Sequence, residues 1–402
     1  MGKWEMVRLG DVATYINGYP FKPSDWTMQG LPIIRIQNLT ESSNIINYYD
    51  KSYNMRYEIN DGDILISWSA SLGVYKWGKG KALLNQHIFK VVFDKISFDK
   101  RFFKYIIEQK IEEMMRFTHG STMKHITKKY FDEIQICCPP LPIQQKIVDI
   151  LDRASALIEK RKAQIKKLDL LIKSQFIGMF GDPVINPMGW EVRRLGDCGS
   201  FKNGMNFSQN ESGYRIKCLG VGDFGNLYIM DDMDSISEIS LSSEPSQDYL
   251  LQESDIVFVR SNGNRALVGR SVEVFPDNTR LTYSGFCIRY RNAFGNLQTL
   301  YLNHLLHLPS MRFALLGDGR GSNIQNVNQK ALSSLAIPIP PLALQTQFSA
   351  FVERVEAQKA KMKQGLELLE LEYKSLMQKC FSGKTPPVSS ADSPLNLRGP
   401  LP

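Results

Sequence analysis

Side chains that can hydrogen-bond to base edges are concentrated in a few short segments of this chain. Arg fits guanine edges, Asn and Gln fit adenine edges, and Lys, Ser or Thr can hold phosphates. The candidate DNA contacts of the first half are Arg35, Gln37, Asn38, Ser67, Ser69, Asn85, Gln86, His87, Lys124, His125, Lys128 and Lys129. Those of the second half are Arg215, Lys217, Arg260, Asn262, Asn264, Arg265, Arg320, Asn323, Gln325, Asn326 and Lys330. Each segment alone is a weak signal, because an ordinary solvated loop has the same composition.

Motifs for catalysis are missing from the sequence. Residues 78–81 contain Gly and Lys but lack the spacing of a phosphate-binding loop, so ATP hydrolysis is not indicated. Residues 186–189, Asn-Pro-Met-Gly, lack the aromatic residue and second proline of the loop of base-methylating enzymes, and no glycine-rich turn for S-adenosylmethionine precedes them. His304 and His307 could share a metal, but no third ligand is evident and a structural role is favoured. We expect no catalytic residue, metal or cofactor in this chain.

Composition places the chain among globular proteins with more than one domain. It has 402 residues, of which 43% are hydrophobic and 22% charged. No run of eighteen apolar residues and no signal peptide is visible, so a soluble cytoplasmic protein without membrane contact is expected. The six cysteines show no CxxC spacing, which predicts free thiols. A net charge of +8 fits a polyanionic partner.

Two long amphipathic stretches must position the polar segments. Apolar residues recur three and four apart after Pro-Pro-Leu in both, which predicts helices over 142–181 and 342–383. Gly181, Asp182 and Pro183 supply a stop for the first helix. The apolar stripes are narrow, so each helix is expected to bury a seam against a partner helix. The seam residues are Ile143, Ile147, Ile150, Leu157, Ile165, Leu168, Ile172, Leu344, Phe348, Phe351, Val355, Leu366 and Leu369.

The whole chain reads as a tandem repeat. Residues 4–21 match 190–207, and 120–141 match 321–342. The predicted domains are a mixed domain over 1–141, the first helix, a second similar domain over 182–341, the second helix, and a disordered Pro- and Ser-rich tail over 384–402. Predicted strands are 31–36, 64–67, 88–93, 215–219 and 256–259, and predicted short helices are 100–115 and 297–316. The fold class is therefore α+β.

A helix that leaves each domain toward the other implies an antiparallel coiled coil with pseudo-twofold symmetry. Two similar domains on a helical spacer suit two separated sites on duplex DNA. The domains differ most in their polar loops and agree most at their borders, as two different half-sites on one scaffold would require.

These features strongly resemble the specificity subunit of type I restriction-modification systems, over residues 1–383. The resemblance rests on tandem domains, each closed by a Pro-Pro-Leu-x-x-Gln helix, with a Trp-Glu-x-x-x-Leu-Gly-Asp start. It implies a non-catalytic subunit that binds double-stranded DNA with a bipartite target and docks two modification subunits and, through them, restriction subunits. S-adenosylmethionine would belong to the modification subunits, and ATP and Mg to the restriction subunits. One departure is an apolar residue before the motif's Gln, Ile143 and Leu344, where the family often has Glu.

Two other classes stay open on the sequence alone. A two-ended coiled-coil adaptor would not need basic loops rich in Asn, Gln and Arg. The recognition module of a single-chain restriction-modification enzyme would need fused catalytic domains.

Overall fold

A computed structural model describes residues 4–69, 71–116, 126–208, 211–225, 227–317 and 326–381. Two compact units divide the chain: unit 1 combines Met1–Lys162 with Gln364–Pro402, and unit 2 is Ala163–Lys363. Each unit therefore holds one globular region and parts of both long helices. The predicted tail lies outside the described residues.

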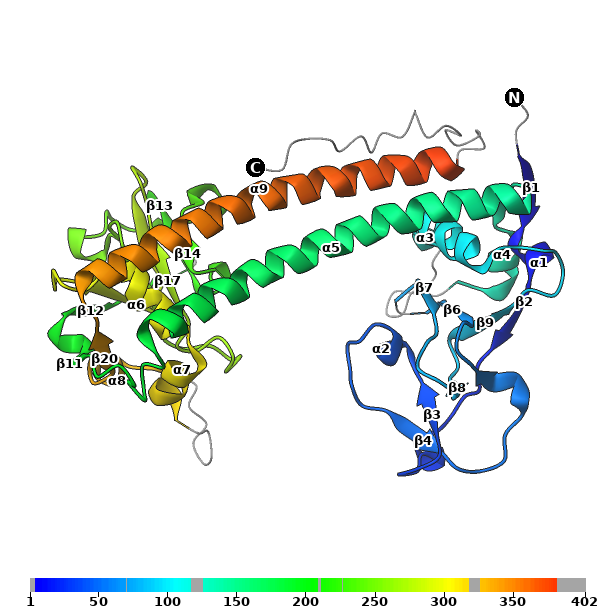
Figure 1. Cartoon of the computed structure of the whole chain (residues 1–402), viewed down its shortest axis with the longest axis horizontal. Coiled ribbons are helices and arrows are strands. Elements are labelled where there is room, and N and C mark those ends of the chain that lie inside the picture. Colours follow the sequence, from blue (N-terminus) through cyan, green and yellow to red (C-terminus); the bar gives the residue numbers. More distant parts are fainter. Residues whose placement is uncertain are drawn as a thin grey trace. The chain divides into compact units, whose positions relative to one another are not determined.

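The two longest elements are helices α5 (Leu141–Phe180) and α9 (Leu342–Phe381), each of 40 residues (Figure 1). α5 ends where Gly181 takes a φ of 76°, a left-handed conformation that glycine adopts without strain. Both predicted helices are confirmed, and the mixed α+β fold with a repeated domain is confirmed as well. The short helix predicted over 297–316 is wrong as one element. It forms α6 (Thr299–Leu306) and α7 (Pro309–Leu316), because Pro309 forces Leu308 into an extended conformation.

Besides its parts of α5 and α9, unit 1 shows three small sheets and four helices in its described residues. The first sheet pairs β1 (Glu5–Arg8) with β10 (Gln135–Cys138). The second has the order β2 (Thr14–Asn17), β9 (Ile88–Val92), β6 (Ile64–Ser67), β7 (Gly73–Lys76). The third has the order β4 (Asn47–Tyr49), β3 (Leu31–Ile34), β8 (Ala82–Leu84), β5 (Glu58–Ile59). The helices are α1 (Leu9–Val12), α2 (Ile36–Leu39), α3 (Lys100–Arg116) and α4 (Lys128–Glu133).

Unit 2 repeats this plan. The first sheet pairs β11 (Glu191–Arg194) with β20 (Ala336–Ile339). The second has the order β12 (Gly199–Asn203), β19 (Cys287–Asn292), β16 (Asp255–Val259), β17 (Ser271–Val274), β14 (Ile229–Met230). The third has the order β15 (Glu238–Leu241), β13 (Tyr214–Leu219), β18 (Leu281–Tyr283). Helix α8 (Gln329–Ser333) takes the place of α4.

The repeat extends to strand direction. In unit 1, β3 runs parallel to β8 and antiparallel to β4. In unit 2, β13 likewise runs parallel to β18 and antiparallel to β15. The internal similarity read from the sequence is therefore a similarity of topology.

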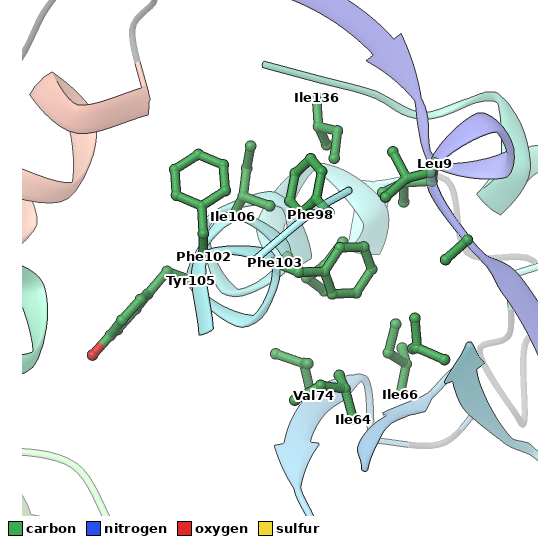
Figure 2. Close-up of a cluster of buried hydrophobic side chains, with 14 of the residues drawn as sticks. Leu9, Ile64, Ile66, Val74, Phe98, Phe102, Phe103, Tyr105, Ile106 and Ile136 are labelled. Carbon is green, nitrogen blue, oxygen red and sulfur yellow. The ribbon is translucent and has the colours of Figure 1, made fainter. Parts of the chain in front are cut away.

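Helix α3 supplies much of the core of unit 1. Figure 2 shows Phe103 directed at the strands that carry Ile64, Ile66 and Val74. Phe102 and Phe103 are fully buried, and Phe102 contacts Phe381 near the end of α9 with ring centroids 5.3 Å apart. In unit 2 the aromatic rings of Phe176, Tyr301 and Phe348 join α5, α6 and α9 in the same way.

The long helices run antiparallel within each unit. In unit 2, Phe176 contacts Phe348, and Lys359 pairs with Asp169 at 2.5 Å, so residue numbers rise on one helix as they fall on the other. In unit 1, Lys162 pairs with Glu370 at 3.0 Å. Asp169 and Glu370 are equivalent residues of the repeat, so in each unit the same helix position pairs with a lysine of the other helix, although the two lysines are not equivalent.

Burial along the predicted seam is uneven. Of the proposed seam, Ile147, Ile172, Phe348, Val355 and Leu369 are buried, and the remaining seam residues are half-buried. The fully buried Val148 and Leu151 lie outside that stripe. They pack into the core of unit 1 together with Ile147, because the helix ends contact their globular regions as well as each other.

Candidate nucleic-acid interface

Four segments of unit 1 converge on Trp68, directly after β6. The Trp68 N–H donates to the His87 carbonyl at 3.2 Å, and the Ile126 N–H donates to the Trp68 carbonyl at 3.1 Å. Trp68 Nε1 donates to Asn17 Oδ1 at 3.2 Å, and the Trp68 and His87 ring centroids are 4.9 Å apart. The ends of β2 and β6, the β8–β9 loop and the segment before α4 therefore meet at one place.

Unit 2 has the same arrangement of backbone hydrogen bonds, here called the frame, around Arg260, directly after β16. The Arg260 N–H donates to the Phe286 carbonyl at 2.8 Å, and the Val327 N–H donates to the Arg260 carbonyl at 2.8 Å. These bonds make Arg260 the counterpart of Trp68. Phe286, whose side chain is 63% exposed, is the counterpart of His87.

A glycine at the end of the first long strand completes each frame. A Cβ added to Gly18 would lie 2.0 Å from the Asn85 carbonyl oxygen, and one added to Gly204 would lie 2.2 Å from that of Ser284. Because neither backbone can move away easily, only glycine permits this close crossing. The glycine of each Asn-Gly pair thus permits the close approach of the β8–β9 or β18–β19 loop.

The turn after β3 joins this site in unit 1, since the Asn85 N–H donates to the Ile34 carbonyl at 3.0 Å. The predicted strand 31–36 ends at Ile34, and the next residues form α2 instead of a loop. Asn38 caps this turn: its Oδ1 accepts from the Arg35 N–H at 3.0 Å and its Nδ2 donates to the Ile45 carbonyl at 2.9 Å. The Asn38 side chain is therefore occupied in stabilising this turn. Gln37 is half-buried, and the Arg35 guanidinium lies 5.4 Å from the centroid of the Trp26 ring.

The two predicted serine contacts are not accessible. Ser67 is fully buried and its hydroxyl donates to the carbonyls of Ser71 and Gly73, while Ser69 is 2% exposed. Burial excludes both from contact with a ligand, which corrects the sequence interpretation. The sequence did not reveal this because Ser67 is the last residue of the buried strand β6, and Ser69 accepts a backbone hydrogen bond from Ser71 in the turn that follows.

The other candidates of unit 1 lie at or near the convergence. Asn85, Gln86 and His87 are half-buried, and Asn85 Oδ1 accepts from the Gln86 N–H at 2.9 Å. Lys128 and Lys129 are exposed at the start of α4, where Lys128 pairs with Asp132 at 2.7 Å. These side chains provide a positive, amide-rich rim.

In unit 2, the loop after Arg260 is built by its own side chains. The side-chain Oδ1 atoms of Asn262 and Asn264 accept from the backbone N–H groups two residues on, at 2.7 and 3.0 Å. Arg312 donates to the Ala266 carbonyl at 2.8 Å, and burial, with the nearby charge of Arg270, lowers the pKa of Arg312. The loop is thus braced and presents the exposed side chain of Arg265.

Some of the predicted DNA contacts of unit 2 lie at the frame around Arg260, and others lie elsewhere. Asn326 bridges to Ser261 across the site, and Lys330 is exposed on α8. Arg215 and Lys217 lie on β13, in another sheet, where Lys217 donates to the Met233 carbonyl at 2.5 Å. Some candidates lie outside the described residues: Lys124, His125, Arg320, Asn323 and Gln325.

Sequence reasoning missed Phe286, Asn17 and Asn203 at these sites. It included Trp68 and Gln329 only as members of the polar segments 67–71 and 320–330 without singling them out; Gln329 donates to Asn203 Oδ1 at 3.0 Å. The repeat of Asn17-Gly18 at Asn203-Gly204 was the available signal for the asparagines. Aromatic rings can contact base methyl groups or stack on bases, so Trp68 and Phe286 belong in the candidate set.

His304 and His307 of unit 2 are buried and packed inside the fold. Burial lowers the pKa of His304 to about 3 and that of His307 to about 4, and both rings stack on Tyr228. His307 Nε2 lies 2.7 Å from the Ser271 carbonyl oxygen. No group of three metal-binding side chains occurs within the described ranges. All six cysteines are free thiols.

Fold and site together define a duplicated α+β protein with one loop cluster per repeat. The family described as "Type I restriction modification DNA specificity domain" matches residues 1–167 and 187–372. The chain therefore belongs to the type I restriction-modification DNA specificity family.

Named relatives cover nearly the whole chain. It is 24% identical to the type I restriction enzyme MjaVIII specificity subunit of Methanocaldococcus jannaschii, covering 95% of this chain and 92% of the relative. It is 24% identical to the type I restriction enzyme StySPI specificity subunit of Salmonella potsdam, covering 98% of this chain and 92% of the relative. Among solved structures, one chain matches with a TM-score of 0.60 at 18% identity, covering 95% of this chain and 98% of that chain. It comes from a study of complex assembly and conformational transition of the type I R-M system. Across the described residues, no helix could span a membrane.

Proposed function

We propose that this chain directs a cytoplasmic type I restriction-modification complex to a bipartite, asymmetric DNA target. Each unit contacts one half of the target with the loop cluster around Trp68 or Arg260. The observation that carries the proposal is the pair of equivalent frames with different side chains: Trp68 and His87 in unit 1, Arg260 and Phe286 in unit 2. Equivalent frames explain one mode of DNA contact, and different side chains explain two different half-sites.

The chain also docks two modification subunits that carry adenine methyltransferase activity. Leu170 on α5 and Leu371 on α9 are equivalent residues of the repeat and are 56% and 62% exposed. Exposed leucines at matched positions suit two copies of the same partner. S-adenosylmethionine is then bound by those partners, and restriction subunits with ATP and Mg join through them, so this chain performs no catalysis.

Methylation mapping tests the proposal. The chain would be expressed with its modification partner, and adenine methylation would be mapped across a genome. We expect one bipartite motif. Replacement of residues 22–138 by the equivalent region of a relative should change one half of that motif only. Absence of a bipartite motif in an assembled, active complex would leave an adaptor role in its place, and a change in both halves would refute independent recognition.

A further inference from the structure

Unit 2 contains a cavity of about 920 Å³. Its walls come from the edge of the sheet formed by β16, β17 and β19, from the start of α6 and from the first third of α9. Carboxylates and hydroxyls line it beside apolar side chains such as Leu297 and Val352. This size lies in the range of cavities that hold small organic ligands.

A buried carboxylate stands at the base of this cavity. Glu273 on β17 is 1% exposed, and within the described residues its Oε2 has no hydrogen-bond partner. Burial raises its pKa to about 7, although hydrogen bonds from Thr299 and Ser254 act in the opposite direction. Leaving a carboxylate oxygen buried and unbonded costs free energy, so a missing partner is indicated.

Unit 1 provides an internal reference for the same region. Gln144 Oε1 accepts from the Asp99 N–H at 2.8 Å, and Gln345 Oε1 accepts from the Gln298 N–H at 2.8 Å. These matching bonds align α3 with α6 and α5 with α9, residue by residue. Side chains at equivalent positions can therefore be compared directly.

The carboxylate on the long helix has cationic and hydroxyl partners in unit 1. Asp152 accepts from Arg101 at 2.9 Å and from the Tyr105 hydroxyl at 2.5 Å. The equivalent carboxylate in unit 2 is Glu353, which lines the cavity, and the position of Arg101 is taken by Leu300. Glu353 has no ion pair among the residues described, so unit 2 lacks the cation that unit 1 supplies itself.

The charge at the position of Glu273 also differs between the two units. Glu273 pairs with Ile256 across the sheet, and the equivalent partner of Ile64 in unit 1 is Lys76. A lysine in unit 1 is thus replaced by a buried carboxylate. The neighbouring turn carries Ser254 at a φ of 64°, a left-handed conformation that disfavours side chains.

Nearby cations of unit 2 are already engaged. Arg291 lines the cavity, but its guanidinium donates to both oxygens of Asp255, at 2.7 and 2.8 Å. Lys359 bonds to Asp169 at 2.5 Å and to Glu356 at 3.1 Å. Across the described part of the chain, neither the buried Glu273 nor the solvent-exposed Glu353 has an ion pair.

We infer that this cavity binds a small organic cation, an alkylguanidine or alkylamine, whose charged group contacts Glu353 and Glu273 and whose carbon chain contacts the apolar wall. Carboxylates recognise guanidinium and ammonium groups by charge-assisted hydrogen bonds. The site is separate from the loop cluster and does not depend on the proposed function.

Isothermal titration calorimetry of the full chain with agmatine and with putrescine tests this inference, and the two ligands distinguish a guanidinium from an ammonium site. We expect saturable binding of at least one of them. Glu353→Gln should weaken it by about tenfold or more, which corresponds to about 1.4 kcal/mol. Leu300→Arg should abolish binding while every carboxylate is kept, because the introduced guanidinium copies the position of Arg101 in unit 1.

Glu367→Gln is the matched control, since Glu367 is an exposed glutamate on the same helix, outside the cavity. It should bind like the original chain, and circular dichroism should show that every variant is folded. No saturable binding of either ligand to the original chain would overturn the inference. Unchanged affinity in folded Glu353→Gln would overturn it as well.

Discussion

Gln345 Oε1 accepts a hydrogen bond from the backbone N–H of Gln298 at 2.8 Å, so the first turn of α9 is tied to the start of α6. Its Nε2 donates to the carbonyls of Pro340 and Asn296 at 2.8 and 2.9 Å. Gln345 is fully buried, and Gln144 makes the equivalent bonds to Asp99 and Pro139 in unit 1. The Gln of the Pro-Pro-Leu-x-x-Gln motif therefore joins each long helix to its globular region.

Loss of this junction should destabilise the protein. Gln345→Leu would leave the Gln298 N–H and two carbonyls without a partner, at a cost of about 1–3 kcal/mol per buried polar group. We expect a clearly lower urea midpoint. Gln347→Leu, on an exposed position of the same turn, is the control and should change the midpoint little. Equal midpoints for both variants would show that the junction carries little stability.

The contribution of Glu273 to the stability of the original chain should depend on pH. The folded-state pKa of about 7 lies above the ordinary value of 4.5, so the folded state holds a proton that the unfolded state has already lost between these values. Stability of the original chain should therefore fall as pH rises from about 4.5 to 7 and level off above it. No charged group contributes to the shift. The charged groups nearby in the cavity are Glu353, Glu356 and the Arg291–Asp255 pair.

Glu273→Gln removes this term, so the variant should match the original chain near pH 5 and exceed it at pH 8 by up to about 3 kcal/mol. Urea unfolding at both pH values measures the difference. Glu367→Gln should show no such gain at pH 8. A constant difference between the two pH values would mean that Glu273 is already ionised at pH 5.

Arg265 and Phe286 should contribute to DNA binding in different ways. Arg265→Ala in the assembled complex should weaken binding and reduce the slope of log affinity against log salt by about 0.9, because one phosphate contact is lost. Phe286→Ala should weaken binding with an unchanged slope, since an aromatic ring releases no counterion. Fluorescence anisotropy over a salt series measures both. If the two variants gave the same slope, Arg265 would not contact a phosphate.

The exposed leucines should control the number of modification subunits bound. Leu170→Asp and Leu371→Asp each place a charge on one proposed docking surface, and burying an unpaired charge is costly. We expect each single variant to bind one modification subunit and the double variant none, as read by mass photometry. Each single variant is the control for the other. Full assembly of the double variant would place the docking surfaces elsewhere.

The long helices and the repeat were predictable because their signals are long. Periodicity over two stretches outweighs any local ambiguity, and Pro and Gly marked their ends. The fate of single polar residues was not predictable in this way. Ser67 is buried and Asn38 caps a turn because of contacts with residues nearby in space, such as Gly73 and Ile45, that no local pattern reveals. The break before α7 could have been read from Pro309, which cannot continue the helix that precedes it.

The bonds that hold each loop cluster run largely between main-chain atoms, as between Trp68 and His87 or between Arg260 and Phe286. Such bonds survive exchange of the side chains that the loops display. Mutational drift can therefore alter these side chains in one unit while the other unit keeps its own set. Gly18 and Gly204 are the exceptions, since any larger residue there would displace the loop itself. Lineages of this chain should diversify quickly at the displayed side chains and hardly at all at these two glycines.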